Sequence, residues 1–361
     1  KMKTAFICFF PVFPTNMGSA EVIRSLFLCW PGQKKLFQIS HLNKSNYKNN
    51  LFSVKIFKEK PILKIICIPF LIYKILKYLG KTKKRLLVIE GPSWIGYSFI
   101  TLVLIKIFSP TTKVIYHSHS IEFEVRKMMS SNIMAFFSKK LENFVFNNSH
   151  LSTSVSKIEM NKIKKLYGVQ CINLNNGVSK KVLKFGKRKI GFDYIIYSGS
   201  YKYLPNKNAI DYLVDVLMPK LIKKFPKLKL VLTGGGYEKK KNYIVNLGIV
   251  SKPKLLNLIY NSKLMVVPID KGTGTRIKII EAMLIGAKVL TTKKGIEGIS
   301  FEKKKFPIVV KKKFFYNVII KNLKNHLKNT KITKFDKNYT MEKIVIDFFE
   351  NEYVKNIFKK N

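Results

Sequence analysis

The chain has 361 residues, enough for two ordinary domains, and 47% of them are hydrophobic, which excludes intrinsic disorder as the default state. The formal net charge of +48 is compatible with a nucleic-acid-binding protein or with a coding bias toward lysine. Only five of the 68 basic residues are arginine, and the lysines are spread over the whole length, which favours the bias. Of the possible partners, an anionic membrane surface is the one that such a positive charge would suit best, because anionic lipids attract cationic proteins.

The cysteines form no C-x-x-C pair, and their spacing suits neither a zinc site nor a disulfide framework, which indicates a reducing compartment. They are Cys8, Cys29, Cys67 and Cys171. The N-terminal run KMKTAFICFF breaks at Pro11, too early for a typical signal peptide, and predicts a first buried strand. No stretch reaches about 18 uncharged apolar residues, so a spanning helix is not expected. The nearest candidates, 61–79 and 93–108, both contain lysine.

Short apolar runs alternate with helical patterns through the first half of the chain. The expected strands are 5–10, 86–91, 113–119, 151–156 and 171–178. The expected helices lie near 20–29, 94–108, 121–148 and 157–167. Strands that are apolar throughout and alternate with helices predict a parallel sheet covered on both faces.

The same alternation begins again after a charged segment. The expected strands of the second half are 193–200, 227–236, 263–269 and 287–292, with helices near 205–226, near 253–261 and after residue 272. The sequence therefore predicts two doubly wound α/β domains. Their bounds are 1–180 and 193–338, with a linker at 181–192 and an amphipathic C-terminal helix at 339–361.

Residues 61–79, PILKIICIPFLIYKILKYL, are apolar apart from Lys64, Lys74 and Lys77, and Pro69 is expected to kink any helix formed there. Such a segment suits a membrane interface, with the lysine ammonium groups reaching lipid phosphates. The alternative is a helix of the protein core. We favour the interface, and we expect a cytoplasmic protein bound peripherally to the inner face of the cytoplasmic membrane.

The stretch GTGTRIKIIEAMLIGAKVL begins as a glycine loop just past an expected strand and continues as a helix. Ligands of open parallel sheets bind outside the carboxyl ends of the strands. Gly272 and Gly274 would allow the backbone to approach a ligand, and Thr273 or Thr275 could cap the helix. The free N–H groups of the first helical turn, together with nearby cations, would form a site for phosphate or diphosphate.

Glu281 lies one helical turn past Lys278. Phosphate repels a carboxylate, but a ribose can donate hydrogen bonds to it, as in dinucleotide sites. The alternative is a surface Lys–Glu pair worth a few tenths of a kcal/mol. The surrounding sequence IIEAMLIGAKVL is too apolar for an exposed helix, which favours the ribose contact.

This stretch resembles the nucleotide-sugar signature of retaining glycosyltransferases of family 4, in the branch whose motif runs G-[ST]-G-T-R-x-K-x-x-E-A-M. Many members have a second glutamate where this chain has Thr273, although that branch lacks it as well. Further segments are similar to family elements in the same order, with Ser120 in place of Asn and Asn175 in place of Pro. They are MGSAEV (17–22), HSHSIEFEVRK (117–127), NNGV (175–178), YSGSYKYLPNKNAIDYL (197–213) and GIEG (295–298).

The resemblance implies a GT-B fold, in which two Rossmann-like parallel-sheet domains face a cleft and the C-terminal helix packs back towards the first domain. It implies catalytic roles for His119, Arg276 and Lys278, with His119 contacting the donor sugar or the acceptor. His117 is expected on the opposite face of its strand, in the core. The residues expected to bind the donor are Gly18, Lys207, Gly235, Thr273, Gly274, Thr275, Arg276, Lys278 and Glu281.

The implied reaction moves a sugar, in the manner of a hexosyltransferase, from a nucleoside diphosphate to a hydroxyl with retention. The acceptor would be a lipid-linked or saccharide molecule of bacterial surface polysaccharide or glycolipid synthesis. No Asp-x-Asp motif occurs, so we expect no metal and no other cofactor. The alternatives are an inactive nucleotide-sugar-binding or partner subunit and, resting on charge alone, a nucleic-acid-binding protein, for which the sequence has no recognition motif.

Overall fold

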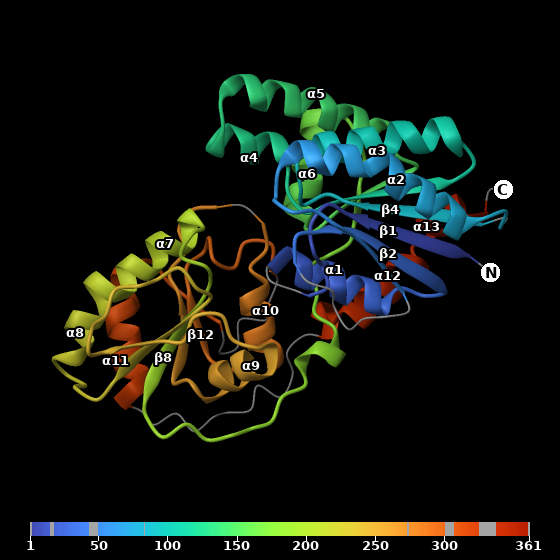
Figure 1. Cartoon of the computed structure of the whole chain (residues 1–361). Helices are drawn as coiled ribbons and strands as arrows, with labels where there is room; N and C mark the ends of the chain where they lie inside the picture. The colour runs from blue at the N-terminus through green and yellow to red at the C-terminus, as the bar shows by residue number, and fades with distance from the viewer. Residues whose placement is uncertain are drawn as a thin grey trace. The chain divides into compact units, whose positions relative to one another are not determined.

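The computed structural model describes residues 2–14, 18–42, 50–82, 84–272, 274–299, 307–324 and 337–359. The chain divides into two compact units, each with its own sheet (Figure 1). The first unit comprises Lys1–Ser179 together with Asn338–Asn361, and the second comprises Lys180–Lys337. Of the expected site residues, Thr273 lies outside the described part of the chain.

The first sheet is parallel throughout, in the order β3-β2-β1-β4-β5-β6-β7. The order reverses between β1 and β4, which makes their carboxyl ends the expected ligand edge of this unit. The strands are β1 (Lys3–Cys8), β2 (Gln33–Ser40), β3 (Leu51–Lys55), β4 (Arg85–Glu90), β5 (Lys113–Ser118), β6 (Leu151–Ser154) and β7 (Ile172–Asn173).

Helices α2, α3 and α5 cover one face of this sheet, and α1 and α12 lie on the other face (Figure 1). A cluster of apolar side chains from α2, α3 and α5 fills the layer between these helices and the strands. The helices of the unit are α1 (Gly18–Cys29), α2 (Pro61–Leu79), α3 (Ile95–Phe108), α4 (Glu122–Met129), α5 (Asn132–Asn148), α6 (Lys157–Tyr167), α12 (Met341–Glu350) and α13 (Glu352–Lys359).

The helix expected at 121–148 is in fact two helices, because a capping serine starts the second. The Ser131 hydroxyl accepts a hydrogen bond from the Met134 N–H at 3.3 Å and begins α5. The expected C-terminal helix is also two helices. The Asn351 side chain accepts from the N–H groups of Tyr353 (3.0 Å) and Val354 (3.3 Å), which caps α13.

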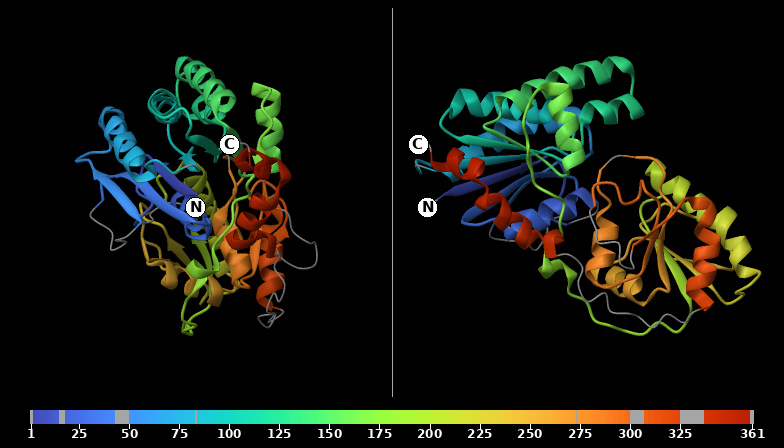
Figure 2. Two further views of the ribbon diagram at one scale, coloured as in Figure 1. Left: turned by 90° about the vertical axis from the view of Figure 1, so that its right-hand side faces the viewer. Right: turned by 180° about the vertical axis from the view of Figure 1, so that it is seen from behind.

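The C-terminal helices belong to the first unit (Figure 2). Just before α12, the chain pairs with residues at the end of the Lys1–Ser179 segment, where the Val178 N–H donates to the Tyr339 carbonyl at 3.1 Å. Further along α12, the rings of Phe348 and Phe349 pack on the buried Trp30, with centroids 5.7 and 4.9 Å away. Aromatic burial on the first unit therefore fixes α12 to it.

The second sheet is also parallel, in the order β10-β9-β8-β11-β12-β13, and reverses between β8 and β11. Its strands are β8 (Tyr194–Ser198), β9 (Lys229–Thr233), β10 (Ile244–Asn246), β11 (Leu264–Val267), β12 (Val289–Thr291) and β13 (Ile308–Val309). Its α-helices are α7 (Leu204–Asp211), α8 (Met218–Ile222), α9 (Lys252–Asn261), α10 (Ile277–Leu284) and α11 (Phe315–Lys324). A π-helical segment, Tyr212–Leu217, joins α7 to α8, and short 3-10 turns occur at Lys180–Leu183, Lys312–Phe314 and Lys337–Tyr339.

Both sheets have the strand order of a doubly wound nucleotide-binding fold. Within the described ranges, no helix combines the length and the apolar character that a membrane span requires.

Candidate functional site

The loop between β11 and α10 lies at the carboxyl edge of the second sheet, beside the point where the strand order reverses. Gly272 and Gly274 have φ angles of 107° and 79°, which favour glycine. A side chain at Gly272 would also place its Cβ 3.0 Å from Pro205 and 3.1 Å from Nη2 of Arg276. The loop therefore packs directly against Arg276. Of the two threonines expected to cap the helix, Thr275 is not the N-cap residue. That position belongs to Arg276, whose side chain makes no capping hydrogen bond within the described residues.

Lys278 reaches back from α10 to the end of β8. Its Nζ atom donates to the Tyr197 hydroxyl at 3.2 Å, the Ser198 carbonyl at 2.6 Å and Oδ1 of Asn206 at 3.1 Å. The ammonium also lies 4.4 Å from the centroid of the Tyr197 ring. These contacts hold the Lys278 amino group at the β8–β11 switch point. A phosphate bound at this point would either replace one of the three acceptors as a hydrogen-bond partner of Lys278 Nζ, or attract the ammonium by its charge alone.

Arg276 is buried and donates from Nη1 to the Gly274 carbonyl. Burial lowers the pKa of its guanidinium. Burial and the nearby Arg276 charge lower the pKa of Lys278 to about 7, while Glu281 opposes the shift. Two crowded cations of this kind are stabilised by an anion, which suits a phosphate or diphosphate.

Glu281 is buried and forms an ion pair with Lys252 at the start of α9. The alternative in which Glu281 forms a pair at the surface is therefore wrong. Its carboxylate lies one turn along α10 from the two cations, where a ribose could donate to it. Lys252 carries no signal in the sequence, because the two partners are 29 residues apart.

The other expected donor-binding residues have local roles in the structure. Lys207 is exposed and pairs with Asp211 one turn along α7 at 2.9 Å. Gly235 has a φ angle of 75°, so the turn after β9 is itself a reason for glycine there. The neighbouring Gly234 could not carry a Cβ, which would lie 2.5 Å from the Gly199 backbone. Gly18 begins α1, and no described atom lies within 4 Å of the position of its Cβ.

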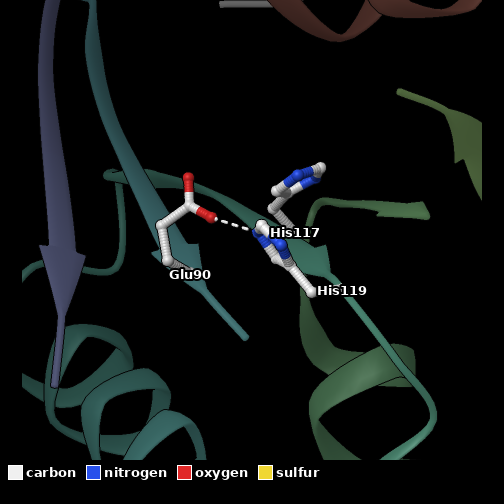
Figure 3. Close-up of side chains that lie close together, drawn as sticks. All are labelled: Glu90, His117 and His119. Atoms are coloured by element: carbon white, nitrogen blue, oxygen red, sulfur yellow. Dashed lines mark hydrogen bonds and ion pairs between the residues drawn. The ribbon is translucent and has the colours of Figure 1, made fainter. Parts of the chain in front are cut away.

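In the first unit, Glu90, His117 and His119 gather at the carboxyl ends of β4 and β5 (Figure 3). Glu90 and His117 are directly opposite in the register of the two strands. Nε2 of His119 lies 2.8 Å from Oε2 of Glu90, and the two imidazole rings meet edge to face with centroids 4.4 Å apart. His117 is buried as expected, but it does not lie on the opposite face. Residues two apart on a strand share a face.

All three side chains are buried, and burial disfavours their charged forms. It raises the pKa of Glu90 to about 7 and lowers the pKa values of His117 and His119 to about 3. Both imidazoles are therefore neutral at physiological pH. One ligand atom from each side chain lies within 4.8 Å of the others, so the three could hold a divalent ion. Such an ion would have to replace the proton between His119 and Glu90.

Comparison with known proteins identifies the fold. Residues 193–321 match the family model described as Glycosyl transferases group 1. No curated protein matches the sequence. A solved glycosyltransferase from Rickettsia africae ESF-5 is 14% identical, with a TM-score of 0.68 over 100% of this chain and 100% of that one.

Two further solved structures cover nearly the whole chain. The Anabaena protein Alr3699/HepE, in complex with UDP and glucose, is 13% identical, with a TM-score of 0.66 over 100% of this chain and 98% of that one. A putative UDP-N-acetylglucosamine 2-epimerase from Listeria monocytogenes is 12% identical, with a TM-score of 0.61 over 99% of this chain and 97% of that one. The chain has the GT-B fold, and the segment that matches the group 1 glycosyltransferase model lies in its second unit.

Proposed function

We propose that the protein transfers a sugar from a nucleoside diphosphate to a hydroxyl acceptor with retention of configuration. The observation that carries this proposal is the gathering of Arg276, Lys278 and Glu281 around the start of α10. They lie at the switch point of the second sheet, inside the segment that matches the glycosyltransferase family model. That family match favours transfer over epimerisation, which the Listeria protein of the same fold is named for.

In the proposed mechanism, the diphosphate lies beside the first turn of α10 and Glu281 accepts hydrogen bonds from the ribose. Arg276, Lys278 and the helix N-terminus stabilise the negative charge that develops on the leaving diphosphate. That diphosphate helps to deprotonate the acceptor on the same face, which gives retention. His119 of the first unit contacts the donor sugar or the acceptor. The reaction needs no metal, because the protein's own cations neutralise the diphosphate.

A donor screen tests this proposal. In the presence of a chelator, the melting temperature should rise with one class among UDP-, GDP- and ADP-sugars, because a ligand at about 100 times its Kd adds about 2.7 kcal/mol of stability. CMP-sugars carry a single phosphate and are the negative control. Binding without turnover would favour the inactive nucleotide-sugar-binding subunit. A shift with nucleic acid and with none of the sugar nucleotides would contradict the proposal and favour the nucleic-acid-binding alternative.

We also propose that the enzyme docks peripherally on the inner face of the bacterial cytoplasmic membrane and acts there on a lipid-linked acceptor of surface polysaccharide or glycolipid synthesis. The support is an apolar stripe along the outer face of α2. It consists of side chains between 47% and 65% exposed, at nearly helical spacing: Ile62, Ile66, Phe70 and Tyr73. Burying this stripe in the lipid interface would stabilise docking by the hydrophobic effect.

The lysines of α2 differ in their surroundings. Lys74 lies at this surface, with its ammonium 5.1 Å from the centroid of the Phe70 ring, and Lys77 is exposed. The Lys64 side chain is only 11% exposed and pairs with Glu59, so it is a poor candidate for a lipid contact, contrary to expectation. The alternative of a core helix describes only the inner face of α2, where Ile68, Ile72 and Ile75 are buried.

The membrane proposal predicts flotation with anionic vesicles. The protein should rise with phosphatidylglycerol-containing liposomes at low salt, and less at high salt, since each lysine near the surface contributes about 1 kcal/mol that salt screens. The double variant Ile66→Ser/Phe70→Ser should float less at both salt concentrations. A matched change on the exposed face of the second unit, Ile249→Ser, should leave flotation unchanged. If the native protein stays at the bottom at low salt, the membrane proposal is wrong and a soluble acceptor is favoured.

A further inference from the structure

The Glu90 carboxylate is fully buried at the end of β4, and among the described side chains it is hydrogen-bonded to His119. Its Oε2 atom lies 2.8 Å from Nε2 of His119, and its Oε1 atom has no hydrogen-bond partner within the described structure. A carboxylate only accepts hydrogen bonds. The hydrogen in the contact between Glu90 and His119 therefore belongs to Nε2 of the imidazole when Glu90 is ionised.

His117 does not compete for this contact. Its Nδ1 atom lies 2.7 Å from the Thr153 hydroxyl oxygen, which in turn is 3.5 Å from the Tyr116 carbonyl. The hydroxyl hydrogen can therefore be directed to that carbonyl while the oxygen accepts from Nδ1 of His117. The His117 ring also packs edge to face on His119, at an interplanar angle of 78°. His119 is thus held by a hydrogen bond on one side and by a ring on another.

We propose that ionised Glu90 is a positioning residue, which fixes His119 in the tautomer with hydrogen on Nε2 and leaves Nδ1 as a hydrogen-bond acceptor. Figure 3 shows the second ring nitrogen of His119 on the far side of the ring from Glu90. Nδ1 can then accept a hydrogen bond from a hydroxyl, the group that both a sugar donor and a saccharide acceptor present. The opposite tautomer would donate there instead. This inference rests on the proposed function for its substrate and on the geometry alone for the tautomer.

The tautomer is read directly from the ¹⁵N chemical shifts of His119 at pH 8 in the presence of a chelator. The native protein should show hydrogen on Nε2 alone. Glu90→Ala should give a mixture of tautomers, whereas Glu90→Gln should restore the native tautomer, because its amide oxygen can still accept from Nε2. Hydrogen on Nδ1 in the native protein, or an unchanged spectrum in Glu90→Ala, would overturn the proposal.

Kinetics provide the second measurement. Glu90→Ala should lower kcat by about 10- to 100-fold with little change in KM for the donor, the usual effect of removing a residue that orients a histidine. In a His119→Ala background the same change should have no further effect. Equal losses in both backgrounds would mean that Glu90 acts independently of His119.

Glu142→Gln is the matched control. Glu142 is also fully buried, but its carboxylate accepts from the N–H groups of Glu122 and Phe123 and from the Tyr167 hydroxyl. Its replacement should lower the melting temperature and leave both the His119 tautomer and kcat unchanged. If no sugar nucleotide is turned over, the proposed function fails, and the ¹⁵N spectra still decide the role of Glu90.

Discussion

Replacing Lys278 with methionine should lower kcat for sugar transfer by about 100- to 1000-fold, the loss seen when one preorganised donor to a developing negative charge is removed. Affinity for the nucleoside diphosphate should fall by about 10- to 100-fold, because a hydrogen bond to a charged group contributes about 1.5–3 kcal/mol. Methionine keeps most of the side-chain volume, so the packing between α10 and β8 should survive.

The same variant tests the protonation of the site. The pKa of Lys278 is lowered to about 7 without ligand, and a bound diphosphate should raise it again. Below pH 7 the ammonium already carries its proton. Above pH 7 binding must take up a proton, so affinity should decrease as the pH rises from 7.5 to 9. The terminal phosphate, with a pKa near 6, is already ionised over this range.

Calorimetry in buffers of different ionisation enthalpy measures this uptake. The native protein should take up close to one proton per nucleotide at pH 8.5, and Lys278→Met should take up much less. Lys263→Met is the charge-matched control. That residue precedes β11 at the opposite end of the strand and pairs with Asp193, so its replacement should leave binding unchanged. Equal proton uptake in the native protein and Lys278→Met would show that Lys278 is not the titrating group.

Replacing Glu281 with alanine should weaken nucleotide binding by about 1.5–3 kcal/mol, the contribution of hydrogen bonds to a charged acceptor. The reason is the loss of the carboxylate that we assign to the ribose. Removing the ribose hydroxyls from the nucleotide should abolish the same contact from the ligand side. On the native protein, the 2′,3′-dideoxy form of the nucleotide chosen by the donor screen should bind about as weakly as the ribonucleotide binds Glu281→Ala. On the variant, the two nucleotides should bind equally.

The ion pair with Lys252 offers a competing explanation, in which Glu281 only stabilises the packing of α9 and α10. Lys252→Met separates the two, because it removes the pair and keeps the carboxylate. We expect this variant to keep its affinity within about threefold, well inside the loss expected for Glu281→Ala. If it reproduces that loss, or if Glu281→Ala binds normally, the ribose assignment is wrong.

The alternation of apolar strands and helices was enough to predict two parallel sheets. The bounds of the helix expected at 157–167 match those of α6. Its ends carry local signals, because Ser156 caps the N-terminus and Gly168 adopts the left-handed conformation at the C-terminus. Strands β2 and β3 were not predicted. β2 opens with the polar residues QKK, and β3 is half exposed at the edge of the sheet. Their pairing with β1 is decided by tertiary contacts that local pattern does not encode.

The candidate site was also predicted only in part, namely where its residues lie close together in the sequence. Glycines, cations and a carboxylate within ten residues identified the start of α10, because that chemistry is local in sequence. Glu90 could be recognised only as a polar end to an apolar strand, since its contact with His119 depends on the register of β4 against β5. Lys252 and Asn206 carry no local signal. Their contacts with Glu281 and Lys278 exist only after the strands and helices have assembled.

The most direct test of the central claim is a transfer assay with the purified chain. The protein would be incubated with each radiolabelled UDP-, GDP- and ADP-sugar, a chelator, and either lipid extract or oligosaccharide as acceptor. We predict that one donor yields a labelled glycoside with the anomeric configuration of the donor, and that Lys278→Met yields little of it. Release of an epimerised sugar nucleotide, or no product from any donor that the protein binds, would contradict the assignment as a glycosyltransferase.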